Sequence, residues 1–399
     1  MQPDVALISP YPRLGVRHGG ASGVASYTAN LAHALDDIGL DVTVVAPFED
    51  GEPELGNDDG VTVRRAFRMF GADAVPRALA AARATGAGVV HLQHELFLYG
   101  GPATVAGLFA ALARRSATPT VVTMHQVVDP AAVTSDFTRM HRIAVPPVVA
   151  RSGLRALQNG IPRLADATIV HEPAFATAVP AARVVPHGIE TARDAPTRAE
   201  ARRRMGIDDD RLLALCFGFL APYKGLELAL DAAALAAEDV QLVVAGGEHP
   251  RLAAQGESYG DALRQRYGDI ARFTGYVPDA QVASWFRAAD VALYPYPEPH
   301  AASGALALAL THSTAVLLSP KLAASSGAPA ALVAPTDAVE LAERLHSLAV
   351  DRGQLRGLRD AATSLAGDRS WPATALAHQT IYNEVTDAPS TARRRLRAA

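Results

Sequence analysis

Four glycine-rich or proline-rich segments follow expected strands and carry residue types that could bind a phosphate group. The first, residues 18–24, reads HGGASGV and precedes a helical stretch. Glycines let a backbone approach a phosphate closely, and a helix start presents free N–H groups and the positive end of its dipole. The segment matches neither the dinucleotide fingerprint nor a Walker loop. A flexible loop that needs glycine for its backbone conformation explains it equally well.

A lysine beside a glycine marks the second segment, residues 217–227, which reads FGFLAPYKGLE. Lys224 stands at a turn between an expected strand and an expected helix. There its ammonium group could meet a diphosphate as a point charge. The alternative is a solvated surface lysine, which the segment by itself allows.

The third and fourth segments also lie at expected strand ends. The third runs from the glycine pair at residues 246–247 to residue 259 and continues at residues 273–278, FTGYVP. The fourth, residues 294–306, reads YPYPEPHAASGAL. We expect a helix to begin near Ser303 and Gly304, where free N–H groups would suit an anion.

Histidines and a glutamate near strand ends raise the question of a metal site. His91, His94 and Glu95 stand close together in the sequence. Alternation along a strand would direct the two histidines to opposite faces, so we predict no metal site here. We interpret Gln93, His94 and Glu95 as residues that line a cleft or contact an acceptor.

Two further features favour structural roles. Asp208–Asp210 has the composition of an acidic metal motif, but it follows Gly206 in a polar connector, where we predict a solvated turn. Cys216 lies within an apolar run and is predicted to be a buried, inert thiol. No Ser/His/Asp arrangement indicates acyl transfer.

Short apolar runs alternate with helical stretches along the whole chain. This rhythm predicts an α/β fold with parallel sheets covered on both faces. It restarts near residue 190, which predicts two doubly wound halves, and ligands in such sheets bind outside the carboxyl ends of the strands. We take the cleft between the halves as the default site. The expected strands are residues 5–8, 42–46, 89–92, 120–123, 168–170, 183–185, 212–217, 241–245, 272–274, 291–294 and 315–318, and the expected helices include residues 24–38 and 197–205.

Composition excludes several classes of protein. The 399 residues are 49% hydrophobic and 20% charged, which excludes a disordered chain. A single cysteine excludes a disulfide framework. A net charge of -4 with 6% aromatic residues argues against nucleic acid as a partner.

The sequence shows neither a signal peptide nor an apolar run that approaches the about 20 residues of a membrane span, and we predict a cytoplasmic protein. The basic residues 393–397 are predicted to be a solvated tail, with peripheral contact to anionic lipid at the inner membrane face as the alternative.

The four segments together resemble the family-4 retaining glycosyltransferases of the GT-B fold, which move a sugar from a nucleotide donor. The resemblance covers roughly residues 5–385. It is carried by residues 184–189 (VVPHGI), 218–225, 273–277 and 289–295. A narrower branch that lacks the family's usual Glu-x7-Glu pair is indicated by residues 93–101, 246–259 and 303–306.

The resemblance implies the domain organisation. Two facing Rossmann-like, doubly wound parallel sheets would enclose an interdomain cleft. Residues 1–188 would form the N-terminal, acceptor-side domain, to which a C-terminal helix at residues 371–386 returns. Residues 189–370 would form the nucleotide-sugar-binding domain, and residues 387–399 a basic, disordered tail.

The resemblance also implies roles for individual residues. Lys224 would stabilise the leaving diphosphate, and His125 would face the transferred sugar as the second catalytic residue. His94 and Glu95 would lie on the acceptor side. The donor-binding residues would be Gly23, Lys224, Tyr276, Val277, Glu298, His300, Ser303 and Gly304.

Two departures from the family pattern bear on donor recognition. Phe219 and Ala221 stand where an arginine beside the lysine is expected, and Arg251 is the candidate to replace it. His300 and Leu308 stand at the places of the usual glutamate pair, with Glu298 two residues early. A leucine cannot accept ribose hydroxyls, so Ser303 and Gly304 near the phosphates would carry more of the recognition.

The predicted function is retaining transfer of a sugar from a nucleoside-diphosphate sugar to an acceptor hydroxyl. No cofactor and no metal are implied, and the acceptor could be a small molecule, a glycan or a lipid-linked group. A GT-B phosphorylase or sugar-nucleotide epimerase is one alternative, and a catalytically silent homologue that binds a nucleotide sugar or supports a partner is another. A nicotinamide enzyme ranks third, because no good Gly-x-Gly-x-x-Gly follows a strand. The sugar, the base and the acceptor do not follow from the sequence.

Overall fold

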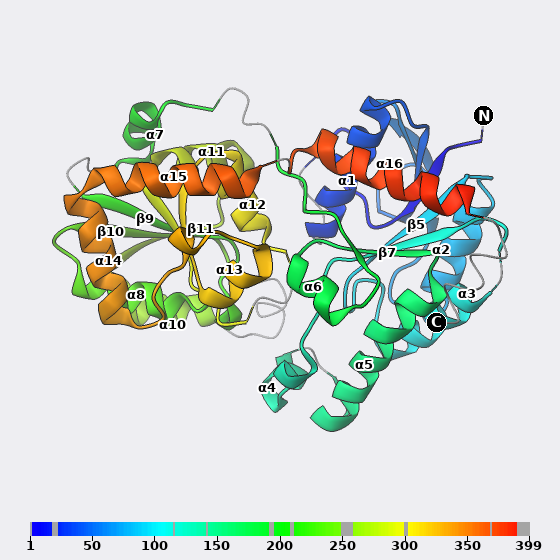
Figure 1. Ribbon diagram of the computed structural model, residues 1–399, viewed down its shortest axis with the longest axis horizontal. Coiled ribbons are helices and arrows are strands. Elements are labelled where there is room, and N and C mark those ends of the chain that lie inside the picture. Colours follow the sequence, from blue (N-terminus) through cyan, green and yellow to red (C-terminus); the bar gives the residue numbers. More distant parts are fainter. Residues whose placement is uncertain are drawn as a thin grey trace. The chain divides into compact units, whose positions relative to one another are not determined.

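A computed structural model describes residues 2–17, 23–114, 116–140, 143–190, 195–207, 211–248, 258–298, 302–367 and 369–388. The chain forms two compact units (Figure 1). Unit 1 contains the residues up to Gly188 and those from Arg369 onward, and unit 2 contains Ile189–Pro299 and Ser303–Asp368. Within the described ranges, none of the helices combines the length and the apolar character needed to cross a bilayer.

Unit 1 is built on an eight-stranded sheet in the order β3-β4-β2-β1-β5-β6-β7-β8. All neighbours are parallel except β3 and β4, which pair antiparallel. The central strand pairs on both sides, with Val5 opposite Val42 and Val89. The strands are β1 (Val5–Ile8), β2 (Val42–Pro47), β3 (Leu55–Asp58), β4 (Val61–Phe67), β5 (Val89–His94), β6 (Thr120–Met124), β7 (Ala167–Val170) and β8 (Arg183–Val184).

Alternate residues of these strands feed two separate cores, one on each face of the sheet. On one face, Val5 and Leu7 pack with helices α1 (Gly23–Asp37) and α16 (Trp371–Asp387). On the other, Ala6 and Ile8 pack with the remaining large helices. Burial on both faces explains the unbroken apolar runs of the central strands. The helices of that second face are α2 (Ala74–Arg83), α3 (Pro102–Ala113) and α5 (Pro147–Leu164), and the short helices are η1 (Pro130–Ala132), α4 (Ser135–Met140) and α6 (Pro173–Ala178).

The hairpin of β3 and β4 was not predicted, because β3 is short and polar and is held by side-chain contacts instead of apolar burial. Asp58 accepts hydrogen bonds from the Tyr11 hydroxyl at 2.7 Å and from the Gly15 N–H at 2.8 Å. His33 Nε2 lies 3.2 Å from the same carboxylate. Burial acts to raise the pKa of Asp58, but these hydrogen bonds outweigh it and the pKa is lowered.

Unit 2 is built on a five-stranded parallel sheet in the order β11-β10-β9-β12-β13. Helices cover both of its faces (Figure 1). The strands are β9 (Leu212–Phe217), β10 (Val240–Ala245), β11 (Ala271–Gly275), β12 (Val291–Tyr294) and β13 (Ala315–Leu318). The helices are α7 (Arg198–Met205), η2 (Pro222–Lys224), α8 (Leu226–Leu235), α10 (Tyr259–Tyr267), α11 (Asp279–Ala288), α12 (Gly304–Thr311), α13 (Pro320–Ser326), η3 (Ala330–Leu332), α14 (Ala338–Val350) and α15 (Arg352–Ala366).

A buried carboxylate ties two helices to the amino end of this sheet. Asp290, directly before β12, accepts hydrogen bonds from the Leu213 N–H at 2.9 Å and from Arg202 Nη2 at 2.5 Å. Arg198 Nη2 lies 2.5 Å and Arg352 Nη1 3.1 Å from its oxygens. Burial of this charge is tolerated because it is paired and hydrogen-bonded. Helices α7 and α15 are thereby fixed to the edge opposite the carboxyl ends of the strands.

Two glycines allow the loops at the carboxyl edge of unit 2 to approach one another closely. A Cβ on Gly246, which follows β10, would lie 2.0 Å from the carbonyl oxygen of Gly218, which follows β9. Gly225 has a positive φ of 61°, and a Cβ there would lie 2.4 Å from the Pro295 carbonyl oxygen. Only glycine satisfies both positions, so the ends of β9, β10 and β12 can converge.

We predict that Gly246→Ala destabilises the protein by about 1–3 kcal/mol, because the added methyl group must displace backbone. The matched control is Gly357→Ala within α15, where a Cβ would have no neighbour within 4 Å. That change should raise stability by up to about 1 kcal/mol, since alanine favours the helix over glycine. Urea unfolding followed by circular dichroism measures both. A Gly246→Ala protein as stable as the wild type would contradict the close approach.

Candidate functional site

Lys224 lies at the carboxyl end of β9, within the turn that the sequence singled out. Its Nζ donates a hydrogen bond to the Tyr296 hydroxyl at 2.6 Å and lies 4.6 Å from the centre of that ring. Burial acts to lower the pKa of Lys224, but the phenol groups of Tyr296 and Tyr223 outweigh it and the pKa is raised. The amine is therefore a cation at neutral pH. The sequence contains only one other lysine, Lys321.

The start of helix α12 lies next to this cation. The Ser303 hydroxyl is 3.4 Å from the Tyr296 hydroxyl and accepts a hydrogen bond from the Leu306 N–H at 3.2 Å, as an N-cap does. A Cβ on Gly218 would lie 3.2 Å from Lys224 Nζ and 3.8 Å from the Ala305 Cβ. A lysine, a tyrosine hydroxyl and a helix N-terminus thus converge. This combination is suited to an anion such as a phosphate group.

The other predicted donor-side residues of unit 2 lie at the same sheet edge but in different settings. Tyr276, just past β11, is 71% exposed, while its neighbour Val277 is buried in the core. Glu298 forms an ion pair with Lys321 of α13. His300 and the candidate cation Arg251 lie outside the described residues.

The departures from the family pattern are visible in this unit as well. Phe219 is 47% exposed and Ala221 is buried, so neither position supplies a charge beside Lys224. Leu308 is half-buried and packs against the core. In unit 1, Gly23 is the exposed first residue of α1, and a Cβ there would have no neighbour within 4 Å. The rest of its loop, residues 18–22, lies outside the described residues.

His125, at the carboxyl end of β6, is buried in unit 1 with a partner for each ring nitrogen. Nε2 lies 2.8 Å from the Gln93 side-chain amide, and Nδ1 lies 3.1 Å from Nε2 of His171. The Tyr27 ring contacts it edge-on, with 4.6 Å between the ring centres. Burial, reinforced by the neighbouring histidines, lowers the pKa of His125 well below its ordinary value. His125 is therefore a neutral imidazole held by hydrogen bonds.

An aromatic group around Tyr27 was missed by the sequence analysis. His171, His187 and Trp371 lie 4.9, 5.0 and 5.3 Å from the Tyr27 ring, measured between ring centres. The Tyr27 hydroxyl is buried and has no hydrogen-bond partner among the residues that the structure describes. His171 could have been found, because it follows an apolar strand in the same way as His125. Trp371 comes from the last helix, and nothing in the sequence pattern placed it beside Tyr27.

Of the predicted acceptor-side residues, His94 is the last residue of β5 and Glu95 directly follows it. His94 is buried, its Nδ1 has no hydrogen-bond partner within the described ranges, and burial lowers the pKa of its ring to about 4. His91 contacts the Tyr382 hydroxyl of α16, on the face to which His94 does not point according to strand alternation. Glu95 is half-buried.

Glu172 is a further buried acid at this sheet edge that the sequence analysis did not single out. It directly follows His171, is 4% exposed, and its Oε2 has no hydrogen-bond partner in the described part of the chain. Burial raises the pKa of Glu172 to about 7, although the charge of Arg369 acts in the opposite direction. The group can therefore hold or release a proton near neutral pH.

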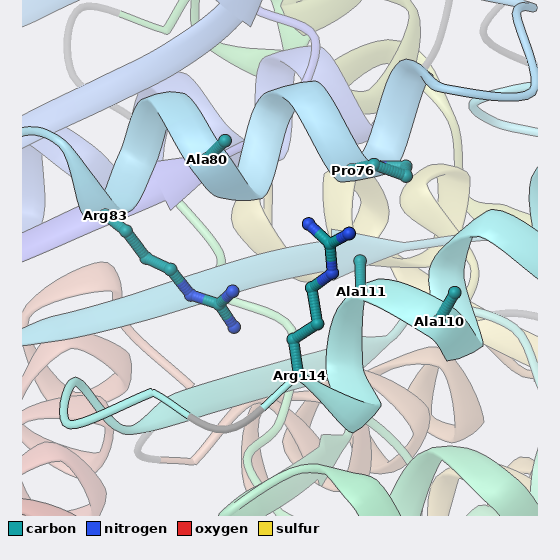
Figure 2. A pocket seen from close by; sticks show the side chains of 6 residues that line it. All are labelled: Pro76, Ala80, Arg83, Ala110, Ala111 and Arg114. Carbon is teal, nitrogen blue, oxygen red and sulfur yellow. The ribbon is translucent and has the colours of Figure 1, made fainter.

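A hollow of about 120 Å³ lies between helices α2 and α3. Figure 2 shows the guanidinium groups of Arg83 and Arg114 in the space between the two helices, and the other lining residues are Pro76 and three alanines. Arg83 Nε is buried and has no hydrogen-bond partner among the described residues. Burial and the charge of Arg114 lower the pKa of Arg83. None of the predicted site residues that the structure describes lines this hollow.

Both halves of the chain match known protein families. Residues 21–193 match the family described as Glycosyltransferase Family 4, and residues 211–351 match Glycosyl transferases group 1. D-inositol 3-phosphate glycosyltransferase of Streptomyces bingchenggensis is 31% identical over 210 residues, which are 49% of this chain and 46% of that relative. The enzyme of the same name from Kribbella flavida is 29% identical over 223 residues, 51% of each chain. The chain thus spans about half the length of these curated relatives.

Solved structures resemble this one over nearly the whole chain. Sucrose-phosphate synthase from Thermosynechococcus elongatus superposes with a TM-score of 0.72 at 21% identity, covering 96% of this chain and 99% of that one. Anabaena HepE in complex with UDP-glucose superposes with a TM-score of 0.67 at 16% identity, covering 95% and 99%. At these identities the likeness concerns the fold.

We predict that Glu172→Gln changes how stability depends on pH. The pKa of Glu172 in the folded protein is above its ordinary value of 4.5, so the folded state holds this proton more tightly and wild-type stability falls as pH rises from about 4.5 to 7. Between these two pH values, the free energy of unfolding of the variant should therefore rise by about 2–3 kcal/mol relative to that of the wild type. Urea unfolding at several pH values measures the difference. Exposed Glu238→Gln is the control, and a difference for Glu172→Gln that stays constant with pH would contradict the prediction.

Proposed function

Because the chain belongs to the family-4 glycosyltransferases of the GT-B fold, we propose that it transfers a sugar from a nucleoside-diphosphate sugar to an acceptor hydroxyl. The two matched families together span most of the chain, as the resemblance in the sequence predicted. The sheet of unit 1, which is parallel apart from β3, the parallel sheet of unit 2 and the likeness to sucrose-phosphate synthase confirm the predicted α/β fold with two doubly wound sheets.

The observation that carries the proposal is the group of Lys224, Tyr296 and the start of α12. A diphosphate that leaves the anomeric carbon gains negative charge, and fixed donors directed at that charge are a major source of catalysis. Lys224 would supply the charge, with its direction set by the hydrogen bond to Tyr296. Backbone N–H groups near Ser303 and Gly304 would bind the phosphate oxygens.

The proposed reaction retains the configuration of the anomeric carbon and needs no metal. The bond between that carbon and the diphosphate oxygen breaks, and both electrons leave with the diphosphate. The acceptor oxygen then bonds to the carbon on the same face, and its proton passes to the departing diphosphate. Lys224 thus takes the part that a divalent cation plays in other transferases.

The remaining predicted residues keep their proposed roles. His125 would contact the transferred sugar, although both of its ring nitrogens have partners within unit 1. His94 and Glu95 would serve the acceptor. Donor binding would further involve Gly23, Tyr276, Val277, Glu298 and His300.

Relatives and neighbours suggest which substrates to test first. Two relatives carry the name D-inositol 3-phosphate glycosyltransferase, so a phosphorylated cyclitol is the first acceptor to test. HepE structures hold UDP and UDP-glucose, so uridine nucleotides are the first donors to test.

We predict that Lys224→Ala lowers kcat for transfer by about 10²–10³-fold, the effect of losing one strong donor to a developing charge. Tyr296→Phe should cost less, because it keeps the cation and removes one hydrogen bond. Exposed Arg356→Ala, which also removes one cation, is the control and should match wild type. Circular dichroism confirms folding of each variant. Turnover by Lys224→Ala at the wild-type rate would overturn the role of Lys224.

A second prediction concerns donor binding. A nucleoside-diphosphate sugar that binds the folded state should raise the melting temperature of the protein by mass action, and EDTA should not reduce that shift. The anomeric coupling in the product, read by NMR, then tests retention. Binding without any transfer or donor hydrolysis would favour the catalytically silent homologue instead.

A further inference from the structure

A continuous set of buried hydrogen bonds runs along the face of the unit 1 sheet that packs against α1 and α16. It joins the Tyr382 hydroxyl, His91, Gln93, His125 and His171. From its arrangement we propose that His171 is a positioning residue, which holds His125 in the tautomer with the proton on Nδ1. Any effect of this tautomer on sugar transfer rests on the proposed function. The assignment of the tautomer itself does not depend on that function.

The backbone determines the direction of the last bond in this set. His171 Nδ1 lies 2.9 Å from the carbonyl oxygen of Val185, in the segment after β8. A carbonyl oxygen only accepts, so this nitrogen must carry a proton. Burial lowers the pKa of His171 to about 3, so at neutral pH the ring carries one proton and its Nε2 is an acceptor.

The proton on His125 follows from that assignment. Its Nδ1 lies 3.1 Å from His171 Nε2, and with an acceptor there His125 must donate. Because His125 is also neutral, its Nε2 then has no proton and accepts. The edge-on Tyr27 ring restricts rotation of the imidazole, so packing supports the same arrangement.

The amide of Gln93 must therefore present its NH2 group to His125 Nε2. Its terminal oxygen occupies the position 2.8 Å away, but the two orientations of an amide have the same shape and the hydrogen-bond partners decide between them. The opposite orientation would require three protons on the two histidines, and so a buried positive charge.

The other end of the set agrees with this orientation. The Tyr382 hydroxyl lies 2.7 Å from His91 Nδ1 and can donate to it, which leaves the His91 proton on Nε2. That nitrogen lies 2.8 Å from the Thr123 hydroxyl and 3.3 Å from the Gln93 amide. Every hydrogen bond then donates in one direction, from Tyr382 to the Val185 carbonyl.

Long-range ¹⁵N–¹H NMR of the full-length protein tests the tautomer directly. In the wild type at neutral pH, His125 should show a protonated Nδ1 and an unprotonated Nε2. His171→Phe should move the proton to Nε2, because the acceptor for Nδ1 is lost and the Gln93 oxygen can accept instead. His171→Gln keeps an acceptor near the position of Nε2 and should restore the wild-type pattern.

His378→Phe is the matched control. It removes another buried histidine, whose ring centre lies 5.5 Å from that of His91, without touching a hydrogen bond of His125. The His125 pattern should stay unchanged in this variant. A wild-type His125 protonated on Nε2, a doubly protonated histidine in the pair, or a pattern that His171→Phe leaves unchanged would each overturn the inference.

Measurements of kcat test whether the tautomer of His125 affects sugar transfer. His171→Phe should lower kcat by on the order of tenfold or more, as a wrong histidine tautomer does in other enzymes, with little change in the donor KM. His171→Gln should recover most of this loss. If the wild type transfers no sugar, the proposed function fails while the NMR result still decides the tautomer. Equal kcat values for the three proteins would overturn the link to transfer.

Discussion

The close approach of the loops after β9 and β10 sets the form of the candidate site in unit 2. The Gly218 carbonyl occupies the space where a side chain on Gly246 would begin, and the Leu220 N–H bonds to the Gly247 carbonyl at 2.9 Å. The loop after β9 is thereby held against its neighbour before it turns back at Lys224. A lysine side chain has four flexible bonds, and its charge is useful at one place only if the backbone beneath it is fixed.

In unit 1, the main constraint is the burial of polar side chains. Many of its polar side chains are buried against the sheet, where an unpaired polar group costs free energy. Most of them have partners, and burial keeps the histidines neutral. Three of the buried atoms that lack a hydrogen-bond partner among the described residues, on Tyr27, His94 and Glu172, lie on elements at the carboxyl edge. These three atoms could still form a hydrogen bond with a ligand that reaches them.

Much of the fold could be predicted because buried strands appear as apolar runs in the sequence and helix ends as capping residues. The run Val5–Ile8 is β1 with the same bounds, and α7 begins after Thr197 and ends before Gly206 as its caps indicate. The hairpin of β3 was missed because hydrogen bonds to Asp58 hold it, and these come from positions far away in the sequence.

The candidate site could be predicted only in part. The lysine turn is local, so Lys224 was found, but its partner Tyr296 is 72 residues away. His125 and His171 lie close together because β6 and β7 are neighbouring strands. The order of strands in a parallel sheet cannot be predicted from local sequence periodicity. The role of each residue remains a prediction, because it depends on a ligand that the fold alone does not identify.

The last helix also determines how the chain can be divided. Helix α16 belongs to unit 1, where Trp371 lies so close to Gly188 that a Cβ on the glycine would be 2.4 Å from the indole ring. In the order of the chain, unit 2 is therefore an insertion into unit 1. Truncation from the C-terminus would damage unit 1 first, by removing Trp371 and Tyr382 from its core. Unit 2 can be separated intact only as an internal fragment, and unit 1 only by joining its two segments with a new linker.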